Sequence, residues 1–446
     1  MTLKVAMLLD HPGHLDTRVA REANILSNAG YIVKIFCLNS DISAKNFQLN
    51  NIEYVQCFDD KTATIPYISR LSHFTRNLWN SKKTTEPSHV NTEYSSNKLG
   101  LLSHFKRVLG TAFSFRQNYK VVSLAVRNFA PDIIHAHDLS MLYAGRCISQ
   151  SIGAKSIYDS HEYECDRNTY ITPLEHKIRM YVERKNIQTV DAIITVSDSI
   201  ADCLVKQYDV NRPLVYLNVG AGVKKDNHKA PNSRHDYGLP ESVKIGIYVG
   251  MLTVGRGIEE MLDAVALTPG LHVAILGNAS MFRISSLRQK TQNLHISARV
   301  HFLAPVPEQD VITIMGLCDF AWIPIQNTCQ SYNFSLPNKL FQSQAAGLPI
   351  FATPLLEISK FVQHFNLGHI AKGFDGPAQA EDLKTFLPNL GQYFLHVRNS
   401  DSLSAYSYDV MRETLLKLYT TMYKIDEIMT SRHLPHMQAD HLNSCS

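Results

Sequence analysis

The feature that most constrains the fold is an alternation of short, continuously apolar segments with segments that are amphipathic at helical spacing. In the first half of the chain the apolar segments include LKVAMLL, IVKIFCL, DIIHAH, AKSIYD, AIITV and PLVYLN. Helix-like stretches, such as residues 17–29, separate most of them. Apolar strands separated by amphipathic helices are typical of a parallel sheet covered on both faces. The pattern therefore predicts an α/β fold.

The same alternation starts again after a polar, charge-mixed stretch. The later apolar segments read KIGIYVG, HVAILG, RVHFLA, DFAWIP and PIFAT. A chain of 446 residues is long enough for two domains. We predict two Rossmann-like doubly wound domains at residues 1–222 and 243–403, joined by a linker at residues 223–242. Ligands of such sheets bind at the carboxyl ends of the strands, so the cleft between the domains is the expected site.

Residues 39–130 are less regular, and we interpret them as an insertion with a basic part at about residues 60–128. Residues 66–127 contain ten Lys and Arg against two Glu, a balance of +8 in a chain of net charge +4. The stretch HFKRVLGTAFSFRQNYKVVSLAVR mixes basic and apolar residues, as helices attracted to anionic lipid do. The alternative is a solvated basic helix. Apolar residues at helical spacing also predict a C-terminal amphipathic helix at residues 404–430, before a tail at residues 431–446.

Several function classes are disfavoured. The eight cysteines are scattered, without CxxC pairs or metal-ligand spacing, which argues against a disulfide framework or a cysteine-bound metal. No apolar run approaches the roughly 18 residues that span a bilayer, and Asp10 interrupts the first apolar segment. We expect a cytoplasmic protein, at most peripheral at the inner face of the plasma membrane. No nucleic-acid recognition motif accompanies the basic segment, so no nucleic-acid partner is expected.

The segment SLPNKLFQSQAAGLP places Pro337 where a helix can start without losing a hydrogen bond. The free amides of a helix N-terminus attract phosphate. Lys339 in the first turn is unfavourable unless an anion offsets its charge. The segment thus predicts an anion site, and an ordinary surface lysine is the alternative.

The segment YVGMLTVGRGIEEML reads as a strand, a glycine turn and a helix. Gly250 and Gly257 would let the backbone approach a phosphate, and Arg256 could bind it bidentately. The alternative is a tight turn with a solvated arginine.

Two further motifs belong to the first domain. In DIIHAHD, His135 and His137 point to one side of a strand. His137, at the carboxyl end, could act as general acid or base or donate a hydrogen bond to a developing charge; we expect His135 to be a core residue bonded to a loop carbonyl. In HPGHLDTRVAREA, Gly13 allows a tight turn, Asp16 can cap a helix and Arg18 could reach the cleft. A cap with solvated arginines is the alternative.

Six segments, in this order, resemble the retaining nucleotide-sugar glycosyltransferases of family 4, which have the GT-B fold: DTRVAREANILSNAGY, DIIHAHD, YDSHE, DAIITVSDSIADCL, the RGIEEMLDA turn and SLPNKLFQSQAAGLP. The resemblance implies transfer of a sugar from a nucleotide diphosphate donor, held by the C-terminal domain, to an acceptor held by the N-terminal domain. It also implies no metal, because basic side chains and a helix N-terminus neutralise the leaving diphosphate.

The resemblance assigns residues to each side of the cleft. His137 would lie near the reacting sugar, and the acceptor side would include Gly13, Asp16, Arg18 and Glu162. The donor side would comprise Gly250, Arg256, Gly257, Asn333, Asn338, Lys339 and Gln342.

Three positions depart from the family pattern. Met251 follows Gly250 where many members have arginine, and Phe334 and Gln342 stand where members have a pair of glutamates. Asn333 substitutes in part for the first carboxylate. Gln342 can still accept from a ribose hydroxyl, at a cost of roughly 1 kcal/mol relative to a carboxylate.

The main hypothesis is a retaining glycosyltransferase that acts on a glycan or lipid-linked acceptor in cell-surface polysaccharide or glycolipid biosynthesis. One alternative is a catalytically idle relative that binds a sugar nucleotide or a partner transferase. The other is a sugar-nucleotide epimerase, which would turn over without an acceptor.

Overall fold

A computed structural model of the chain describes residues 2–13, 16–41, 43–58, 98–168, 172–219, 233–400 and 406–432. At residues 98–109, 112, 309 and 423–432 the description covers the backbone only. Half of the predicted linker, part of the predicted insertion and most of the predicted tail lie outside these ranges.

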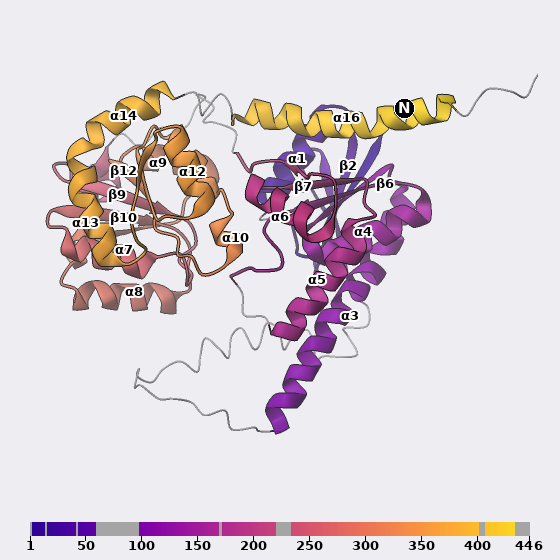
Figure 1. Cartoon of the computed structure of the whole chain (residues 1–446), viewed down its shortest axis with the longest axis horizontal. Coiled ribbons are helices and arrows are strands. Elements are labelled where there is room, and N and C mark those ends of the chain that lie inside the picture. The colour runs from indigo at the N-terminus through magenta and orange to yellow at the C-terminus, as the bar shows by residue number, and fades with distance from the viewer. Residues whose placement is uncertain are drawn as a thin grey trace, which may run out of the picture.

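The described chain forms two lobes, each built around one sheet (Figure 1). The first sheet has the order β3-β4-β2-β1-β5-β6-β7-β8, and its pairs are parallel except β3 with β4. Its elements are β1 (Lys4–Leu9), α1 (Thr17–Asn28), β2 (Ile32–Leu38), β3 (Phe47–Leu49), β4 (Ile52–Cys57), α3 (Lys98–Phe129), β5 (Ile133–His137), α4 (Asp138–Ile152), β6 (Lys155–Ser160), α5 (Pro173–Ile187), β7 (Ala192–Thr195), α6 (Asp198–Tyr208) and β8 (Leu214–Val215).

The second sheet has the order β11-β10-β9-β12-β13-β14 and is parallel throughout. Three short 3₁₀ turns, at Arg234–Tyr237, Ser297–Arg299 and Leu387–Asn389, flank it. Its elements are β9 (Lys244–Val249), α7 (Ile258–Leu267), β10 (Leu271–Leu276), α8 (Met281–Asn293), β11 (Val300–Leu303), α9 (Glu308–Met315), β12 (Phe320–Ile323), α10 (Gln330–Asn333), α11 (Asn338–Ala345), β13 (Ile350–Ala352), α12 (Leu356–His364), β14 (Gly368–Ile370), α13 (Gly376–Phe386) and α14 (Leu390–Asn399).

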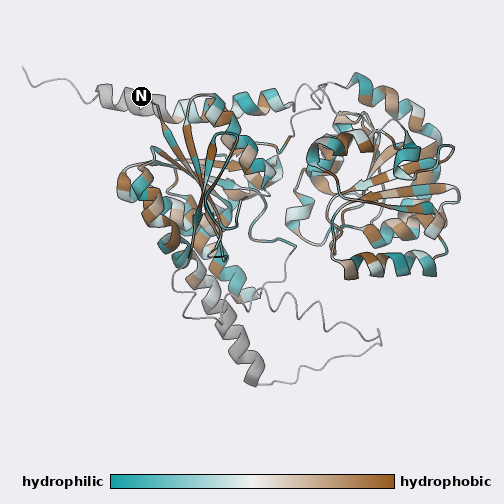
Figure 2. Ribbon diagram, turned by 180° about the vertical axis from the view of Figure 1, so that it is seen from behind, coloured by the Kyte–Doolittle hydropathy of each residue, from teal (hydrophilic) through white to brown (hydrophobic). Residues whose placement is uncertain are grey.

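Strand β1 shows why its sequence is apolar throughout. Successive side chains of a strand point to opposite faces of the sheet. Val5 and Met7 pack in one core with residues of α1, whereas Ala6 and Leu8 pack in another with residues of α3 and α4. Figure 2 shows the hydrophobic strands of both lobes between helices that are polar on the outside. The predicted fold class is therefore confirmed.

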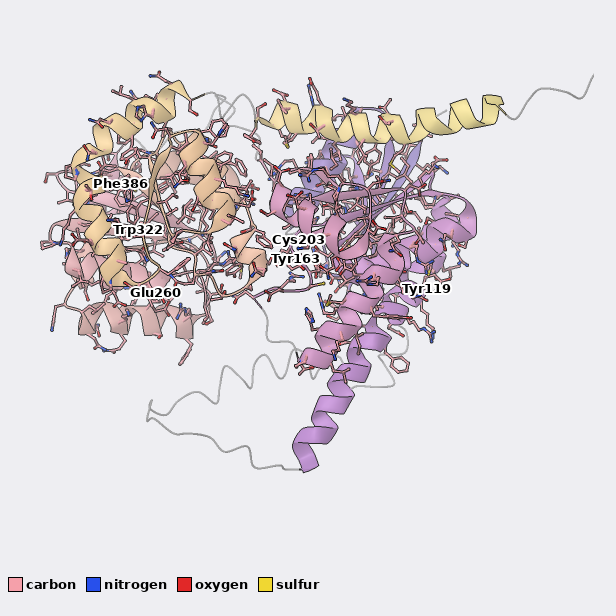
Figure 3. All side chains as sticks on the ribbon, viewed as in Figure 1. Tyr119, Tyr163, Cys203, Glu260, Trp322 and Phe386 are labelled. Carbon is pink, nitrogen blue, oxygen red and sulfur yellow. The ribbon has the colours of Figure 1, made fainter. Side chains whose placement is uncertain are left out.

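Aromatic side chains fill one face of the second sheet. Trp322 and Phe386, which Figure 3 labels in the C-terminal lobe, are both almost completely buried. Phe320 lies against both rings, at centroid distances of 5.7 Å and 5.2 Å. This core fixes the strands whose carboxyl ends carry the candidate donor site.

The interpretation of residues 39–130 as an insertion is wrong for its described parts. Strands β3 and β4 extend the first sheet, and β4 pairs in parallel with β2. Helix α3 covers that sheet through Phe115, Val122 and Val126. The short, partly polar strands and the loop-like composition before α3 concealed this role.

Helix α16 (Tyr408–Arg432) crosses back from the second lobe and lies along the first (Figure 1). Met411, Leu415 and Tyr419 are buried on its inner side, and the ring of Tyr419 meets that of Tyr31 edge to face at 5.6 Å. None of the helices among the described residues is long and apolar enough to cross a membrane.

Candidate active site

The turn after β9 requires glycine at two of the predicted positions. Gly250 has φ +131°, and a Cβ atom there would lie 3.4 Å from Nζ of Lys339. Gly257 has φ +74° at the start of α7, and a Cβ atom there would lie 1.6 Å from the carbonyl oxygen of Pro324. Both positive φ angles favour glycine. The turn thus brings the backbone of the second lobe close to Lys339.

Lys339 lies in the first turn of α11, as the sequence indicated. Pro337 is the N-cap residue, and the helix begins at Asn338, which is exposed. The Lys339 side chain is only 9% exposed, and its Nζ lies 4.2 Å from the centroid of the Tyr248 ring. Nζ has no hydrogen-bond partner among the described residues. Burial, and after it the charge of Arg256, hold the pKa of Lys339 well below its usual range.

Arg256 is the second cation of this edge. Its guanidinium lies over the ring of Tyr332, 4.7 Å from the centroid. Its Nε is buried without a hydrogen-bond partner among the described residues. A buried cationic group without a partner is costly. The buried amino group of Lys339 and the half-buried guanidinium of Arg256, beside a helix N-terminus, have the chemistry of a phosphate site whose anion would satisfy them.

The remaining predicted donor residues divide between the site and its surroundings. Gln342 is half-buried and lies three residues after Lys339 on the same side of α11. The side-chain oxygen of Asn333 accepts from the backbone N–H of Leu356 at 2.9 Å. Asn333 therefore holds the start of α12. Its side-chain oxygen is less available to a ligand than expected. Phe334 packs edge to face against Tyr163 of the first lobe at 6.0 Å.

His137 lies at the end of β5, where it was expected, and is 1% exposed. Its Nδ1 lies 3.1 Å from Nε2 of His161 and 3.5 Å from a carboxylate oxygen of Asp159. Its ring stacks on that of His135 at 4.3 Å. Burial lowers the pKa of His137, so the imidazole is neutral at pH 7.

His135 is a core residue, as expected, but its hydrogen-bond partner is not the one that was expected. The residue is fully buried, but its Nδ1 lies 2.8 Å from the hydroxyl of Tyr419 on α16, not against a loop carbonyl. The C-terminal helix therefore reaches the histidine pair from the far end of the chain.

Arg18 does not reach the cleft, contrary to the sequence interpretation. Its Nη2 donates to both carboxylate oxygens of Asp159 at 2.9 Å, and its Nη1 donates to the carbonyl oxygen of Tyr216 at 3.1 Å. Its Nε lies 3.1 Å from Glu22. The buried carboxylate at the end of β6 draws the guanidinium inward, so Arg18 is part of the network beneath the site.

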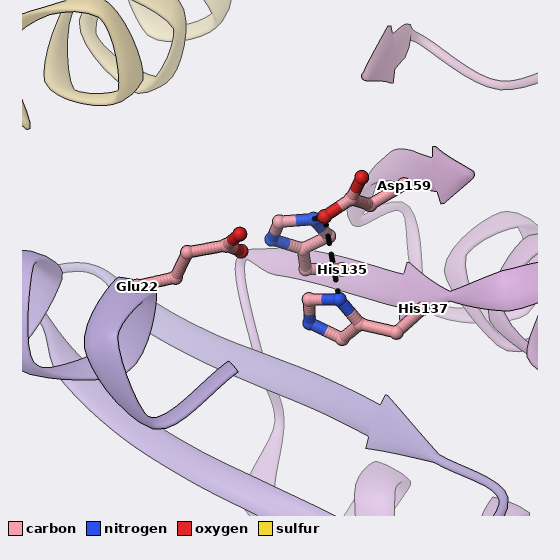
Figure 4. Close-up of side chains that lie close together, drawn as sticks. All are labelled: Glu22, His135, His137 and Asp159. Carbon is pink, nitrogen blue, oxygen red and sulfur yellow. Dashed lines mark ion pairs between the residues drawn. The ribbon is translucent and has the colours of Figure 1, made fainter. Parts of the chain in front are cut away.

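Four side chains of this network have the composition of a metal site (Figure 4). Glu22, His135, His137 and Asp159 place ligand atoms within 4.8 Å of one another. The guanidinium of Arg18, however, already pairs with both carboxylates. Burial, and then the Asp159 charge, raise the pKa of Glu22 above its usual range, which favours its protonated form. Arg18 therefore already supplies a positive charge to the two acidic members of this cluster.

The other acceptor-side predictions lie near the start of α1 and after β6. Gly13 has φ +81° in the turn before α1. Asp16 caps α1 by accepting from the N–H of Val19 at 3.0 Å. Glu162 is partly exposed and accepts from Nε of Arg167 at 2.7 Å.

His161 is the site residue that sequence reasoning missed. Its side chain is 16% exposed, and its Nε2 donates to Asp159 at 3.0 Å. Burial lowers its pKa, but the carboxylates of Asp138 and Asp159 outweigh this and raise the pKa of His161 to about 9. The result is an imidazolium beside the neutral His137. Its place in YDSHE, directly after the carboxyl end of a buried strand, was the available signal.

Comparisons with known proteins agree with this architecture. Residues 107–218 match the model of Glycosyltransferase Family 4, and residues 229–391 match that of Glycosyl transferases group 1. A D-inositol 3-phosphate glycosyltransferase from Corynebacterium urealyticum is 23% identical over 314 residues, which cover 66% of this chain and 73% of the relative.

Solved structures show the same fold at low sequence identity. Sucrose-phosphate synthase from Thermosynechococcus elongatus superposes with a TM-score of 0.67 at 14% identity, covering 95% of this chain and all of the other. HepE from Anabaena, solved in complex with UDP, gives a TM-score of 0.62 at 13% identity, covering 94% and 100%.

Proposed function

Because the chain belongs to the family 4 glycosyltransferases, which have the GT-B fold, we propose that it moves a sugar, with retention of anomeric configuration, from a nucleotide diphosphate donor. The C-terminal lobe would bind the donor, and the N-terminal lobe would hold a glycan or lipid-linked acceptor. The observation that carries the proposal is the pair formed by Lys339 and Arg256 at the carboxyl edge of the second sheet, where Nζ of the lysine and Nε of the arginine are buried without a hydrogen-bond partner in the described part of the chain.

The donor diphosphate would complete this pair. The ammonium of Lys339, the guanidinium of Arg256 and the first amides of α11 would share the negative charge of the phosphates. This charge grows when the bond to the sugar breaks, so groups fixed around it stabilise the transition state more than the ground state. We propose that these residues neutralise the leaving diphosphate without a metal ion.

On the acceptor side, the histidine network would face the reacting sugar. We propose that His137 orients that sugar through a neutral imidazole and that His161, as an imidazolium, stabilises negative charge nearby. If a His137→Ala variant kept full turnover, His137 would have no role in the mechanism. An inverted anomeric product, seen by NMR of the purified glycoside, would refute retention.

UDP is the first donor nucleotide to test, because the Anabaena neighbour was solved with UDP and with UDP-glucose. The experiment compares thermal stabilisation of the protein by UDP, GDP, ADP and their sugar conjugates. A ligand at about 100 times its Kd adds roughly 2.7 kcal/mol. We expect stabilisation by one nucleotide family, its loss in Arg256→Ala and Lys339→Ala, and its retention in the exposed control Lys384→Ala.

The idle relative stays a second candidate because Met251 occupies a position where many members have a phosphate-binding arginine. Its side chain is 62% exposed and offers no charge to a donor. Nucleotide-sugar binding without turnover across a panel of glycan and lipid-linked acceptors would favour this candidate over the transferase.

We also propose that the acceptor is a precursor of a cell-surface polysaccharide or glycolipid at the cytoplasmic face of a membrane. Support comes from α3, whose exposed side carries Phe113, Arg116, Lys120, Leu124 and Arg127 at helical spacing. Phe113 and Leu124 are 67% and 70% exposed. Apolar and basic side chains on one face are what an anionic lipid surface binds.

A further inference from the structure

A segment of the first lobe reaches the donor site of the second. After β6, the chain runs to Asp166, whose carboxylate accepts from the backbone N–H of Gln330 at 2.9 Å. The carbonyl oxygen of Asp166 accepts from the N–H of Ser331 at 3.0 Å. Both amides belong to α10, the short helix that carries Tyr332. The N-terminal lobe is thus fastened to the element that lies beneath Arg256.

Both polar atoms of the Asn168 side chain form hydrogen bonds with the second lobe. Its Nδ2 donates to the hydroxyl of Tyr332 and to the carbonyl oxygen of Val254, each at 3.0 Å. Its Oδ1 accepts from the hydroxyl of Thr328 at 3.0 Å. These three bonds tie α10, the loop before it and the glycine turn after β9 to one residue of the other lobe.

Two of these partners control Arg256 directly. The Tyr332 ring supports the guanidinium at 4.7 Å, and Val254 lies two residues before Arg256 in the same turn. The turn is tight, since a Cβ atom at Gly255 would lie 2.9 Å from Nδ2 of Asn168. A shift of Asn168 would therefore change both the support of the guanidinium and the path of the backbone that carries it.

We propose that Asn168 is a positioning residue of the donor site, supplied by the acceptor lobe. By holding Tyr332 and the turn at Val254, it keeps the Arg256 guanidinium beside Lys339 when the lobes are in contact. Donor affinity then depends on that contact, and a bound donor favours it in return, because the coupling is reciprocal. This inference rests on the proposed donor site.

The test is the Kd for UDP, or for whichever of UDP, GDP and ADP binds the unmodified protein, measured by isothermal titration calorimetry. Asn168→Ala should weaken binding about five- to tenfold. Tyr332→Phe keeps the ring under Arg256 but removes the hydroxyl bond, so it should reproduce part of the loss. The double variant should lose affinity by a smaller factor than the product of the two single factors, because both substitutions remove the same bond between Asn168 and Tyr332.

The control is Glu308→Gln, which removes the ion pair that Arg21 and Glu308 form between the lobes at 3.2 Å without touching the donor turn. It should leave the Kd unchanged. Equal weakening by Glu308→Gln and Asn168→Ala would overturn the specific role of Asn168, since any loss of lobe contact would then suffice.

The donor site and the positioning role of Asn168 can be disproved separately. If the unmodified protein binds a nucleotide and Asn168→Ala and Tyr332→Phe bind it equally well, the positioning role is wrong and the donor site stands. If the unmodified protein binds none of the three, the donor site is wrong and the positioning role falls with it. Should Asn168→Ala fail to fold, Tyr332→Phe alone decides.

Discussion

The amino group of Lys339 lies against an aromatic ring, with no carboxylate bonded to it among the described residues. Burial and Arg256 lower its pKa, and a bound diphosphate would raise it again. Nucleotide binding should therefore take up a proton at pH values between the two pKa values, and affinity should fall as the pH rises through that range. Calorimetry in buffers of different ionisation enthalpy measures this uptake. Lys339→Met should abolish it, and a binding enthalpy independent of the buffer in the unmodified protein would contradict the assignment.

His161 should make stability depend on pH with a definite sign. Its pKa is raised from 6.5 to about 9 in the folded protein. A raised pKa stabilises the fold fully below the unfolded value, and this contribution is lost as the pH rises through about 9. The free energy of unfolding should thus fall between about pH 6.5 and pH 9, by at most about 3 kcal/mol. Denaturant unfolding followed by circular dichroism should show a flatter profile for His161→Gln; parallel profiles would argue against a charged His161.

At this scale the sequence located the donor cations better than the acceptor network. Lys339 and Arg256 are each placed by a local rule, a helix start and a glycine turn. Arg18 was assigned wrongly, because its partner Asp159 lies 141 residues away in sequence. Local patterns carry no information about which distant carboxylate draws an arginine inward. The same limit hid the contact between His135 and Tyr419, which lie 284 residues apart.

Among the secondary-structure elements, α16 has the most direct link to the site. The pKa of Tyr419 is raised well above its usual value by burial, and then by Glu22, so its hydroxyl keeps its proton and can donate to Nδ1 of His135. Tyr419→Phe would leave that buried nitrogen without a partner, at a cost of about 1–3 kcal/mol. Thermal unfolding should report the loss. Tyr31→Phe, which keeps the ring contact with Tyr419 and does not touch His135, should cost less; equal effects would show that the bond between Tyr419 and His135 has no special weight.

Elements that are apolar throughout or along one side could be predicted from the sequence, whereas an element with few buried residues could not. No helix was predicted between the segments HVAILG and RVHFLA, where the structure has α8, because only Leu287 and Thr291 of the 13 residues of α8 are buried, which gives no apolar stripe. Strands β13 and β9 were found because every residue of β13 and nearly every residue of β9 is buried. Hydrophobic periodicity reports burial, so a surface helix held by its caps escapes it.

At the scale of the whole molecule, a membrane-bound acceptor requires that one side of the protein faces the membrane. The basic and apolar side of α3 would set this orientation if it binds an anionic membrane. We expect the protein to float with vesicles of phosphatidylcholine and phosphatidylserine but not with phosphatidylcholine alone. The triple variant Arg116→Glu, Lys120→Glu, Arg127→Glu should lose about 3 kcal/mol of membrane binding, or roughly 100-fold, at about 1 kcal/mol for each basic residue.

Net charge by itself could produce the same loss, so the control must match it. Lys177, Lys384 and Lys417 are exposed and lie on α5, α13 and α16. Changing these three to Glu alters the net charge equally but leaves α3 intact. If only the α3 variant stops floating, the membrane faces α3, and the acceptor reaches the cleft from that side. If both triple variants lose binding equally, overall charge rather than an oriented surface drives the association, and α3 is a solvated basic helix.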